Sequence, residues 1–209
     1  MSQLSLFDQE PDYAPGGRIE RREKAEIFFA PGFFARAEAD RLFAALLKGV
    51  EWQQDHMQAY GKLIPLPRLS AWYGDGDKPY TYSGINLQPK PWTKELGAIK
   101  DKLEEQSEGA TYSSVLLNRY RDGSDYVGWH QDNERELGKN PIIGSVNFGA
   151  TRRFQLRRKD KPEEKMEFEL EHGTLLIMRG ETQHYWQHQV PKTSRPTGER
   201  INLTFRKIF

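Results

Sequence analysis

The chain has 209 residues, 36% of them hydrophobic, which is enough for one domain with a substantial core and too little for two ordinary domains. Its 31 basic and 30 acidic residues give a net charge of +1, so any contact with nucleic acid has to come from local patches. The absence of cysteine excludes disulfides and thiolate metal sites. Without a membrane-spanning run or a secretory signal, we expect a cytoplasmic monomer.

The first seventeen residues are predicted to form a loosely ordered arm, ahead of a single domain at residues 18–209. The arm is polar, contains two prolines and a Gly-Gly pair, and has no periodic apolar face. One stretch differs, because Gln3, Leu4, Leu6 and Phe7 place apolar anchors on a flexible tether. Such anchors can enter a hydrophobic pocket of a partner. A chance apolar cluster in a disordered terminus is the alternative.

The front half of the domain is predicted to supply one strand and two helices. Ala25–Phe29 is a short apolar strand, and Phe33–Val50 has leucines at helical spacing. Trp92–Gln106 is the second helix, preceded by a proline and followed by a glycine. Its Leu96, Ile99 and Leu103 are expected to face the core.

Between these helices lies a region rich in aromatic residues, at about residues 55–90. Aromatic and basic side chains beside glycine and proline suit a surface that stacks bases and touches phosphates. Tyr60, Arg68 and Tyr82 are the residues of interest here. Packing in the core is the alternative for such aromatic residues, and we assign Trp72 to it.

The back half is predicted to be a series of short strands separated by Gly and Pro, which is typical of a sandwich or barrel. The expected strands are Ser113–Tyr120, Gly128–His130, Ile142–Phe148, Arg153–Leu156, Glu167–Leu170, Thr174–Met178, Gln187–Val190 and Ile201–Phe205.

A His-x-Asp pair, His130 and Asp132, is the strongest chemical motif. On an extended segment, side chains two apart point to the same side, so the imidazole and the carboxylate can share one ion. His188 is the preferred third ligand, with His184 as a competitor, while His172 fits a turn. Two histidines and one carboxylate are the ligands of non-haem Fe(II) oxygenases.

Three protein ligands leave three coordination positions of the metal free, and the last predicted strand indicates which co-substrate occupies some of them. Arg200, Asn202, Thr204 and Arg206 alternate with apolar residues, so all four face one side. Arginine pairs with carboxylates through charge-assisted, bidentate hydrogen bonds. Two arginines on one strand face suit a co-substrate with a carboxylate at each end, which describes 2-oxoglutarate.

Four segments together resemble the AlkB family of iron- and 2-oxoglutarate-dependent nucleic-acid dealkylases: NRYRDGSDYVGWHQD, HGTLLIMRG, HQVP and RINLTFR. The similarity runs from about Arg18 to the end. It implies a mainly β, α+β fold, a double-stranded β-helix or jelly roll braced by N-terminal helices. It also implies Fe(II) on His130, Asp132 and His188, with O₂ as the oxidant.

The resemblance assigns roles to further residues. The co-substrate site would comprise Asn118, Tyr120, Arg200, Asn202 and Arg206. The substrate side would comprise a stacking Tyr82, a phosphate-binding Arg68, a Tyr60 loop that fills the gap in the duplex, and also Ser83, Asn133 and Glu134. Gln3 to Phe7 resembles the peptide by which bacterial repair and replication proteins dock on the sliding clamp.

The implied function is oxidative demethylation of bases such as 1-methyladenine and 3-methylcytosine in DNA, a direct-reversal repair that releases formaldehyde. Two other classes stay open: an Fe(II)/2-oxoglutarate hydroxylase or demethylase acting on RNA or on a substrate other than nucleic acid, and a non-catalytic nucleic-acid-binding module. The basic run from Arg152 to Lys161 suits either a phosphate backbone or a solvated hairpin.

Overall fold

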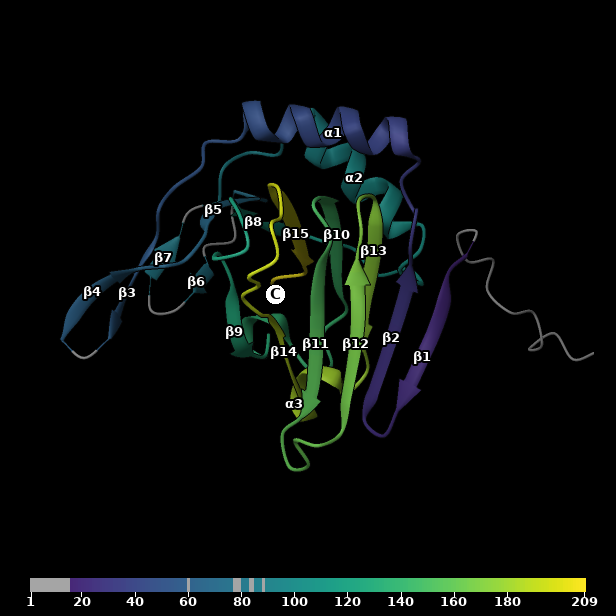
Figure 1. The fold of residues 1–209 in the computed structure, drawn as a ribbon. Coiled ribbons are helices and arrows are strands. Elements are labelled where there is room, and N and C mark those ends of the chain that lie inside the picture. The colour runs from purple at the N-terminus through teal and green to yellow at the C-terminus, as the bar shows by residue number, and fades with distance from the viewer. Residues whose placement is uncertain (1–15, 60, 77–79, 83–84, 88) are drawn as a thin grey trace, which may run out of the picture.

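Two antiparallel sheets face each other in the computed structural model, which describes residues 16–59, 61–76, 80–82, 85–87 and 89–209 (Figure 1). The major sheet has the order β1 (Arg18–Arg22), β2 (Ala25–Ala30), β13 (Thr174–Arg179), β10 (Ile143–Gly149), β15 (Arg200–Arg206), β8 (Ser114–Tyr120), β5 (Leu69–Gly74). The minor sheet has the order β12 (Lys165–Leu170), β11 (Arg152–Arg158), β14 (Trp186–Val190), β9 (Val127–His130). Apart from the β11–β12 hairpin, the chain changes sheet at each step from β8 to β15. This is the connectivity of a double-stranded β-helix, as predicted.

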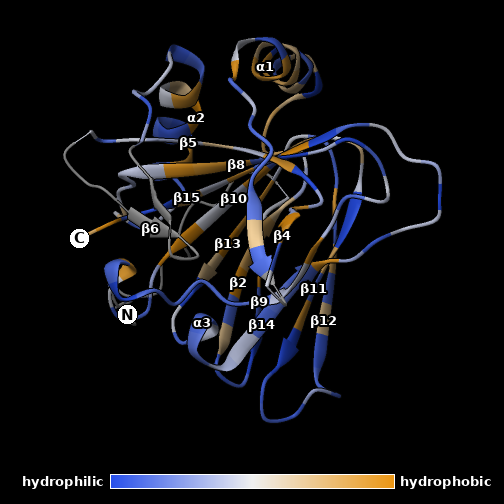
Figure 2. Cartoon of the chain, turned by 90° about the vertical axis from the view of Figure 1, so that its left-hand side faces the viewer, coloured by the Kyte–Doolittle hydropathy of each residue, from blue (hydrophilic) through white to orange (hydrophobic). Residues whose placement is uncertain are grey.

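Two helices cover the outer face of the major sheet, α1 (Arg36–Gly49) and α2 (Lys94–Glu104). Leu42 and Leu46 of α1 share a buried cluster with all three predicted residues of α2, Leu96, Ile99 and Leu103. Figure 2 shows hydrophobic residues along the strands beneath these helices. Thr93 caps α2, because its side chain accepts a hydrogen bond from Leu96 N at 3.3 Å. Both predicted helices therefore exist, with each end trimmed by one to three residues.

A second core fills the space between the sheets. Alternation along β13 divides its residues, since Leu175 and Ile177 join the helix-side cluster whereas Leu176 and Met178 join the inter-sheet cluster. The inter-sheet cluster is apolar over most of its length and includes Phe154 and Trp186 of the minor sheet. Towards β8, β9 and β15 it gives way to polar and charged side chains, which is where the functional site lies.

Two small hairpins extend from the β5 side of the molecule, on the left in Figure 1. One joins β3 (His56–Ala59) and β4 (Lys62–Pro65), and the other joins β6 (Tyr80–Tyr82) and β7 (Ile85–Leu87). On the first hairpin, Leu63 is 70% exposed and Met57 is 48% exposed. These hairpins, β1 and β5 were not predicted as strands. The hairpin strands have only three or four residues, too few positions to establish alternation.

The remaining elements are short: η1 (Arg135–Leu137) follows β9, and α3 (Thr182–Tyr185) precedes β14. Trp72 is buried, as expected for a packing residue. The predicted clamp peptide, Gln3 to Phe7, lies outside the described residues. Among the helices of the described ranges, none combines the length and hydrophobicity needed to span a membrane.

Candidate active site

The three predicted metal ligands converge at the end of the sandwich. His130 on β9 and His188 on β14 are cross-strand partners in the minor sheet, with ring centroids 4.2 Å apart. Asp132 follows two residues after the end of β9. One ligand atom from each of the three residues lies within 4.8 Å of the other two. Two imidazoles and one carboxylate on one side of a cavity are a donor set that fits a non-haem iron ion.

Local contacts prepare His130 for ligation. Its Nδ1 lies 2.8 Å from the carbonyl oxygen of Gly128, so Nδ1 carries the proton and donates to that carbonyl. The other nitrogen, Nε2, is then unprotonated and lies 3.9 Å from Asp132 Oδ1. A backbone carbonyl thus fixes both the tautomer and the ring orientation of this histidine.

The charges around Asp132 keep it ionised. Burial opposes ionisation, but Arg206, and after it His188 and His130, more than compensate, so the pKa of Asp132 lies well below its usual range. Arg206 Nη2 donates to Asp132 Oδ2 at 2.8 Å, and the backbone N–H of Asp132 donates to Gln183 Oε1 at 2.9 Å. Arg206 holds the carboxylate and Gln183 holds the backbone of the same residue, and together they fix Asp132 in position for a cation.

His188 is buried as a neutral ligand. Burial, followed by the neighbouring His130, lowers the pKa of His188 to about 3 although Asp132 acts in the opposite direction. A histidine with this pKa has a free nitrogen lone pair at neutral pH, and only a neutral imidazole can bind a metal ion.

A cavity between the sheets adjoins these ligands. Four consecutive inward-facing residues of β15 line it, as the alternation predicted: Arg200, Asn202, Thr204 and Arg206. The opposite faces of the same strand, Ile201, Leu203 and Phe205, lie in the helix-side core. The cavity wall is completed by residues of both sheets and the segment before β5: Arg68, Leu116, Asn118, Tyr120, Val127, His130, Asp132, Ser145, Phe154, Met178, His188 and Val190.

Arg200 is a buried cation with an incomplete set of hydrogen bonds. Its Nη2 donates to Asn147 Oδ1, and its guanidinium carbon lies 4.8 Å from the centre of the Tyr120 ring. Within the described part of the chain, its Nε and Nη1 have no hydrogen-bond acceptor. Burial lowers the pKa of Arg200 to about 10. A buried cation with two unused donors fits an anionic group of a ligand, and Arg206 beside the metal ligands fits another.

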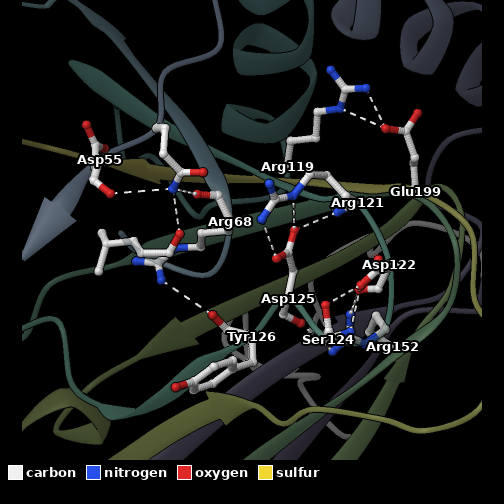
Figure 3. Close-up of polar contacts among 12 residues, drawn as sticks. Asp55, Arg68, Arg119, Arg121, Asp122, Ser124, Asp125, Tyr126, Arg152 and Glu199 are labelled. Atoms are coloured by element: carbon white, nitrogen blue, oxygen red, sulfur yellow. Dashed lines mark hydrogen bonds and ion pairs between the residues drawn. The ribbon is translucent and has the colours of Figure 1, made fainter. Parts of the chain in front are cut away.

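Arg68 occupies a different place from the one predicted. It is only 7% exposed and lines the cavity instead of the outer surface. Its Nε donates to Asn118 Oδ1 at 2.7 Å. Its Nη1 contacts the carbonyl oxygen of Tyr126 at 3.4 Å (Figure 3). The guanidinium is thus engaged within the protein, and its contact with a phosphate stays a prediction.

Three polar residues that support the site were not predicted from the sequence. Ser145 and Asn147 on β10 face the polar side of β15, where Asn202 Nδ2 donates to Ser145 Oγ at 2.8 Å and to Asn147 Oδ1 at 3.2 Å. Their spacing of two in an otherwise apolar strand was a usable signal. The third, Gln183, lies in the short helix α3, and no periodic pattern marks it.

Only some of the predicted substrate-side residues lie in the described part of the structure. Asn133 is exposed, whereas Glu134 is half-buried, and its Oε2 has no hydrogen-bond partner among the described residues. The backbone of Tyr82 belongs to β6, but its side chain lies outside the described part, as do Tyr60 and Ser83.

The two other histidines considered as ligands, His184 and His172, are not part of the metal group. His184 Nε2 accepts a hydrogen bond from the backbone of Asn140 at 3.4 Å, so this competitor of His188 faces another loop. His172 sits in a turn, where its Nδ1 accepts from Gly149 N at 2.7 Å. The metal group formed by described residues therefore contains His188 as its distant histidine.

The basic run on β11 is largely engaged within the protein. Arg152 is buried and donates to three backbone carbonyls, and Arg158 pairs with Glu23 at 2.6 Å and with Asp160 at 2.7 Å. Arg157 lies over the ring of Trp129 at 4.3 Å. The two buried arginines hold loops and turns together, so the run is not a uniform phosphate-binding surface.

Comparisons with known proteins agree with this geometry. Residues 26–206 match the family described as the 2OG-Fe(II) oxygenase superfamily. The chain is 44% identical over 194 residues to the alpha-ketoglutarate-dependent dioxygenase alkB homolog 3 of Rattus norvegicus, which covers 88% of this chain and 65% of that protein. It is 43% identical over 186 residues to the DNA oxidative demethylase ALKBH2 of Mus musculus, covering 84% of this chain and 77% of that protein.

Solved structures support the fold. The structure of OsALKBH1 gives a TM-score of 0.64 at 18% identity and covers 91% of this chain and 100% of its own. A 2OG-Fe(II) oxygenase family oxidoreductase from Burkholderia pseudomallei gives a TM-score of 0.57 at 14% identity, covering 86% of this chain and 84% of its own. The family match, the relatives and the His-Asp-His geometry lead to one conclusion. The chain belongs to the 2OG-Fe(II) oxygenase superfamily and, within it, to the AlkB family.

Proposed function

We propose that this protein oxidatively removes alkyl groups from base nitrogens in DNA, restoring the base and releasing formaldehyde from a methyl group. One observation carries the proposal: the His-Asp-His group and the incompletely bonded Arg200 face the same cavity. The identity of over 40% with DNA oxidative demethylases of the ALKBH2 type supports DNA as the substrate. The expected lesions are 1-methyladenine and 3-methylcytosine.

The metal and co-substrate roles follow from the positions of the residues. His130, Asp132 and His188 would hold Fe(II), and Arg200, with Tyr120 beneath it, would bind the distal carboxylate of 2-oxoglutarate. Arg206, already paired with Asp132, would bind the carboxylate nearest the metal. Asn118 and Asn202 would supply neutral hydrogen bonds along the chain of the co-substrate. When bound, iron, 2-oxoglutarate and O₂ supply the oxidising power for hydroxylation of the alkyl carbon.

The protein groups provide position and charge balance for this chemistry. Gly128 holds His130 through Nδ1, Gln183 holds the backbone at Asp132, and Arg206 offsets the charge of the carboxylate. The buried surroundings of His188 exclude water from that side of the cavity.

On the substrate side, the lesion is a cationic base that has to leave the duplex stack to reach the metal. Glu134 is proposed as the acceptor for this base, because its Oε2 has no hydrogen-bond partner among the described residues, whereas Asp132 is paired with Arg206. Tyr82 is proposed as the stacking side chain, and Tyr60, Ser83 and Asn133 as neighbouring contacts.

We keep the flexible arm and its clamp peptide as a proposal that rests on the sequence alone. Replacing Leu6 and Phe7 by alanine should abolish binding of the bacterial sliding clamp without changing repair of a short oligonucleotide. Clamp binding that survives both replacements would remove this proposal.

The proposed activity has a direct test. Purified protein is incubated with Fe(II), 2-oxoglutarate, ascorbate and air, together with an oligonucleotide that carries one 3-methylcytosine, and the oligonucleotide is weighed by mass spectrometry. The proposal expects loss of one methylene, dependent on 2-oxoglutarate and absent in His130→Ala. An unchanged oligonucleotide in the presence of succinate formation would refute the substrate and retain the oxygenase.

A further inference from the structure

Arg68 is buried where three parts of the molecule meet. Its Nε donates to Asn118 on β8, and its Nη1 contacts the carbonyl oxygen of Tyr126, next to the start of β9. Arg68 itself precedes β5, at the base of the β3–β4 hairpin. Figure 3 shows the guanidinium reaching from the hairpin side towards Tyr126.

The hydrogen bond from Arg68 determines the orientation of the Asn118 side-chain amide. A carboxamide has one accepting end and one donating end, and only the oxygen can receive the N–H of an arginine. Because Arg68 occupies Asn118 Oδ1 at 2.7 Å, the Nδ2 group is the end left to face the cavity that Asn118 lines. An anionic ligand requires a donor at this point and would be repelled by a carbonyl oxygen.

Both neighbours of Arg68 are held rigidly. The Gln54 amide donates to the backbone oxygens of Leu66 at 2.6 Å and Arg68 at 3.2 Å, which fastens the hairpin base. On the other side, Asp125 receives the backbone and guanidinium N–H groups of Arg121 at 2.8–2.9 Å, and so closes the loop before Tyr126. Arg68 is therefore fixed from the hairpin and from the β9 side.

We propose that Arg68 is a positioning residue for the co-substrate: it fixes the amide of Asn118 with Nδ2 towards the cavity and thereby links the hairpin base to co-substrate binding. The inference rests on the assignment of 2-oxoglutarate to this cavity. Without the guanidinium, the amide rotates freely and presents its oxygen to the ligand for part of the time. Arg68 thus acts through Asn118 and not by direct contact with the ligand.

A double-mutant cycle tests whether Arg68 acts through Asn118 or by direct contact with the ligand. The dissociation constant of 2-oxoglutarate is measured by calorimetry with Mn(II) in place of Fe(II), for wild type, Arg68→Met, Asn118→Ala and the double variant. Loss of one hydrogen bond to a charged group predicts a rise of roughly tenfold in Arg68→Met. In the Asn118→Ala background the same replacement should change the constant by less than about twofold, because the amide that Arg68 orients is absent.

Arg119→Met is the matched control, since Arg119 lies beside Asn118 on β8 but pairs with Glu199 at 2.5 Å outside the cavity. It should leave the constant unchanged. If Arg68→Met does not fold, the cycle is measured with Arg68→Lys instead, because lysine keeps the charge but lacks the fixed Nε donor. Equal losses from the Arg68 replacement in both backgrounds would overturn the inference. Failure of the wild type to bind 2-oxoglutarate would instead refute the co-substrate assignment.

Hydrogen exchange supplies a second readout. With Mn(II) bound, 2-oxoglutarate should increase protection of backbone amides in residues 61–70 of the wild type, and this increase should disappear in Arg68→Met but persist in Arg119→Met. An equal increase in all three proteins would show that the hairpin base is not linked to the ligand through Arg68.

Discussion

Replacing Arg200 by methionine should stabilise the protein in the absence of 2-oxoglutarate. The guanidinium is buried, and two of its donor nitrogens have no acceptor among the described residues. Burial lowers its pKa from 12.5 to about 10. Because the folded pKa of this base lies below the unfolded value, the charged form is disfavoured in the native state. The resulting penalty is fully present below about pH 10 and fades as the pH rises towards 12.5.

The magnitude follows from this shift. Each tenfold change in an ionisation constant is worth about 1.4 kcal/mol, so charged Arg200 costs about 3 kcal/mol at neutral pH. Methionine removes that cost but also loses the contact with the Tyr120 ring and the hydrogen bond to Asn147, each worth about 1 kcal/mol. Asn147 Oδ1 retains a donor in Asn202 at 3.2 Å. The net expectation is a gain of about 1 kcal/mol, or about 2–4 °C in the melting temperature.

The assay is thermal unfolding of metal-loaded protein, using Mn(II), with and without 2-oxoglutarate. The wild type should gain stability with the co-substrate, because a ligand that binds the native state shifts the unfolding equilibrium. Without 2-oxoglutarate, Arg200→Met should have a higher melting temperature than the wild type, and addition of 2-oxoglutarate should raise it only a little. The control is Arg152→Met: Arg152 is also buried but donates to three backbone carbonyls at 2.7–3.1 Å, so its loss should lower the melting temperature. A ligand-free Arg200→Met that melts below the wild type would refute the reasoning.

Three further replacements test other contacts. Asn147→Asp places a carboxylate beside Arg200 and should raise the dissociation constant of 2-oxoglutarate at least tenfold, with a smaller effect on 2-oxopentanoate, which lacks the distal carboxylate; equal effects on both ligands would contradict it. Gln183→Leu removes the acceptor for Asp132 N at 2.9 Å and should weaken Mn(II) binding by about 10- to 100-fold in a metal titration; unchanged affinity would exclude this support. Gly149→Ala should cost at least about 2 kcal/mol in denaturant unfolding, because φ is +89° and an added Cβ would lie 2.3 Å from Glu199 O; a neutral effect would contradict the backbone conformation.

The parts of the site that lie on regular strands were predictable from the sequence. On β15, polar and apolar residues alternate without interruption, so Arg200 and Arg206 had to share a face. The spacing of His130 and Asp132 likewise placed both on one side of an extended segment. The choice of His188 over His184 rested on its position before Val190-Pro191 and on the resemblance, and His184 faces the Asn140 loop in the structure.

The parts that depend on contacts between distant segments were not predictable. The resemblance assigned Arg68 to a phosphate, and nothing in the sequence indicated its hydrogen bond to Asn118, which is fifty residues away. Gln183 holds Asp132 from a short helix whose sequence has no periodic pattern. The hairpins β3–β4 and β6–β7 were missed for a related reason, since their strands have only three or four residues and too few positions to establish alternation.

The central claim is that oxidation in this cavity is coupled to an N-alkyl group on a DNA base, and product stoichiometry tests it most directly. Succinate, formaldehyde and restored base are measured in one reaction with Fe(II), 2-oxoglutarate, O₂ and an oligonucleotide that carries one 1-methyladenine. The account predicts equal amounts of the three products. It also predicts far less succinate with the unmodified oligonucleotide. Succinate that forms at the same rate with and without the lesion, and without formaldehyde, would contradict it.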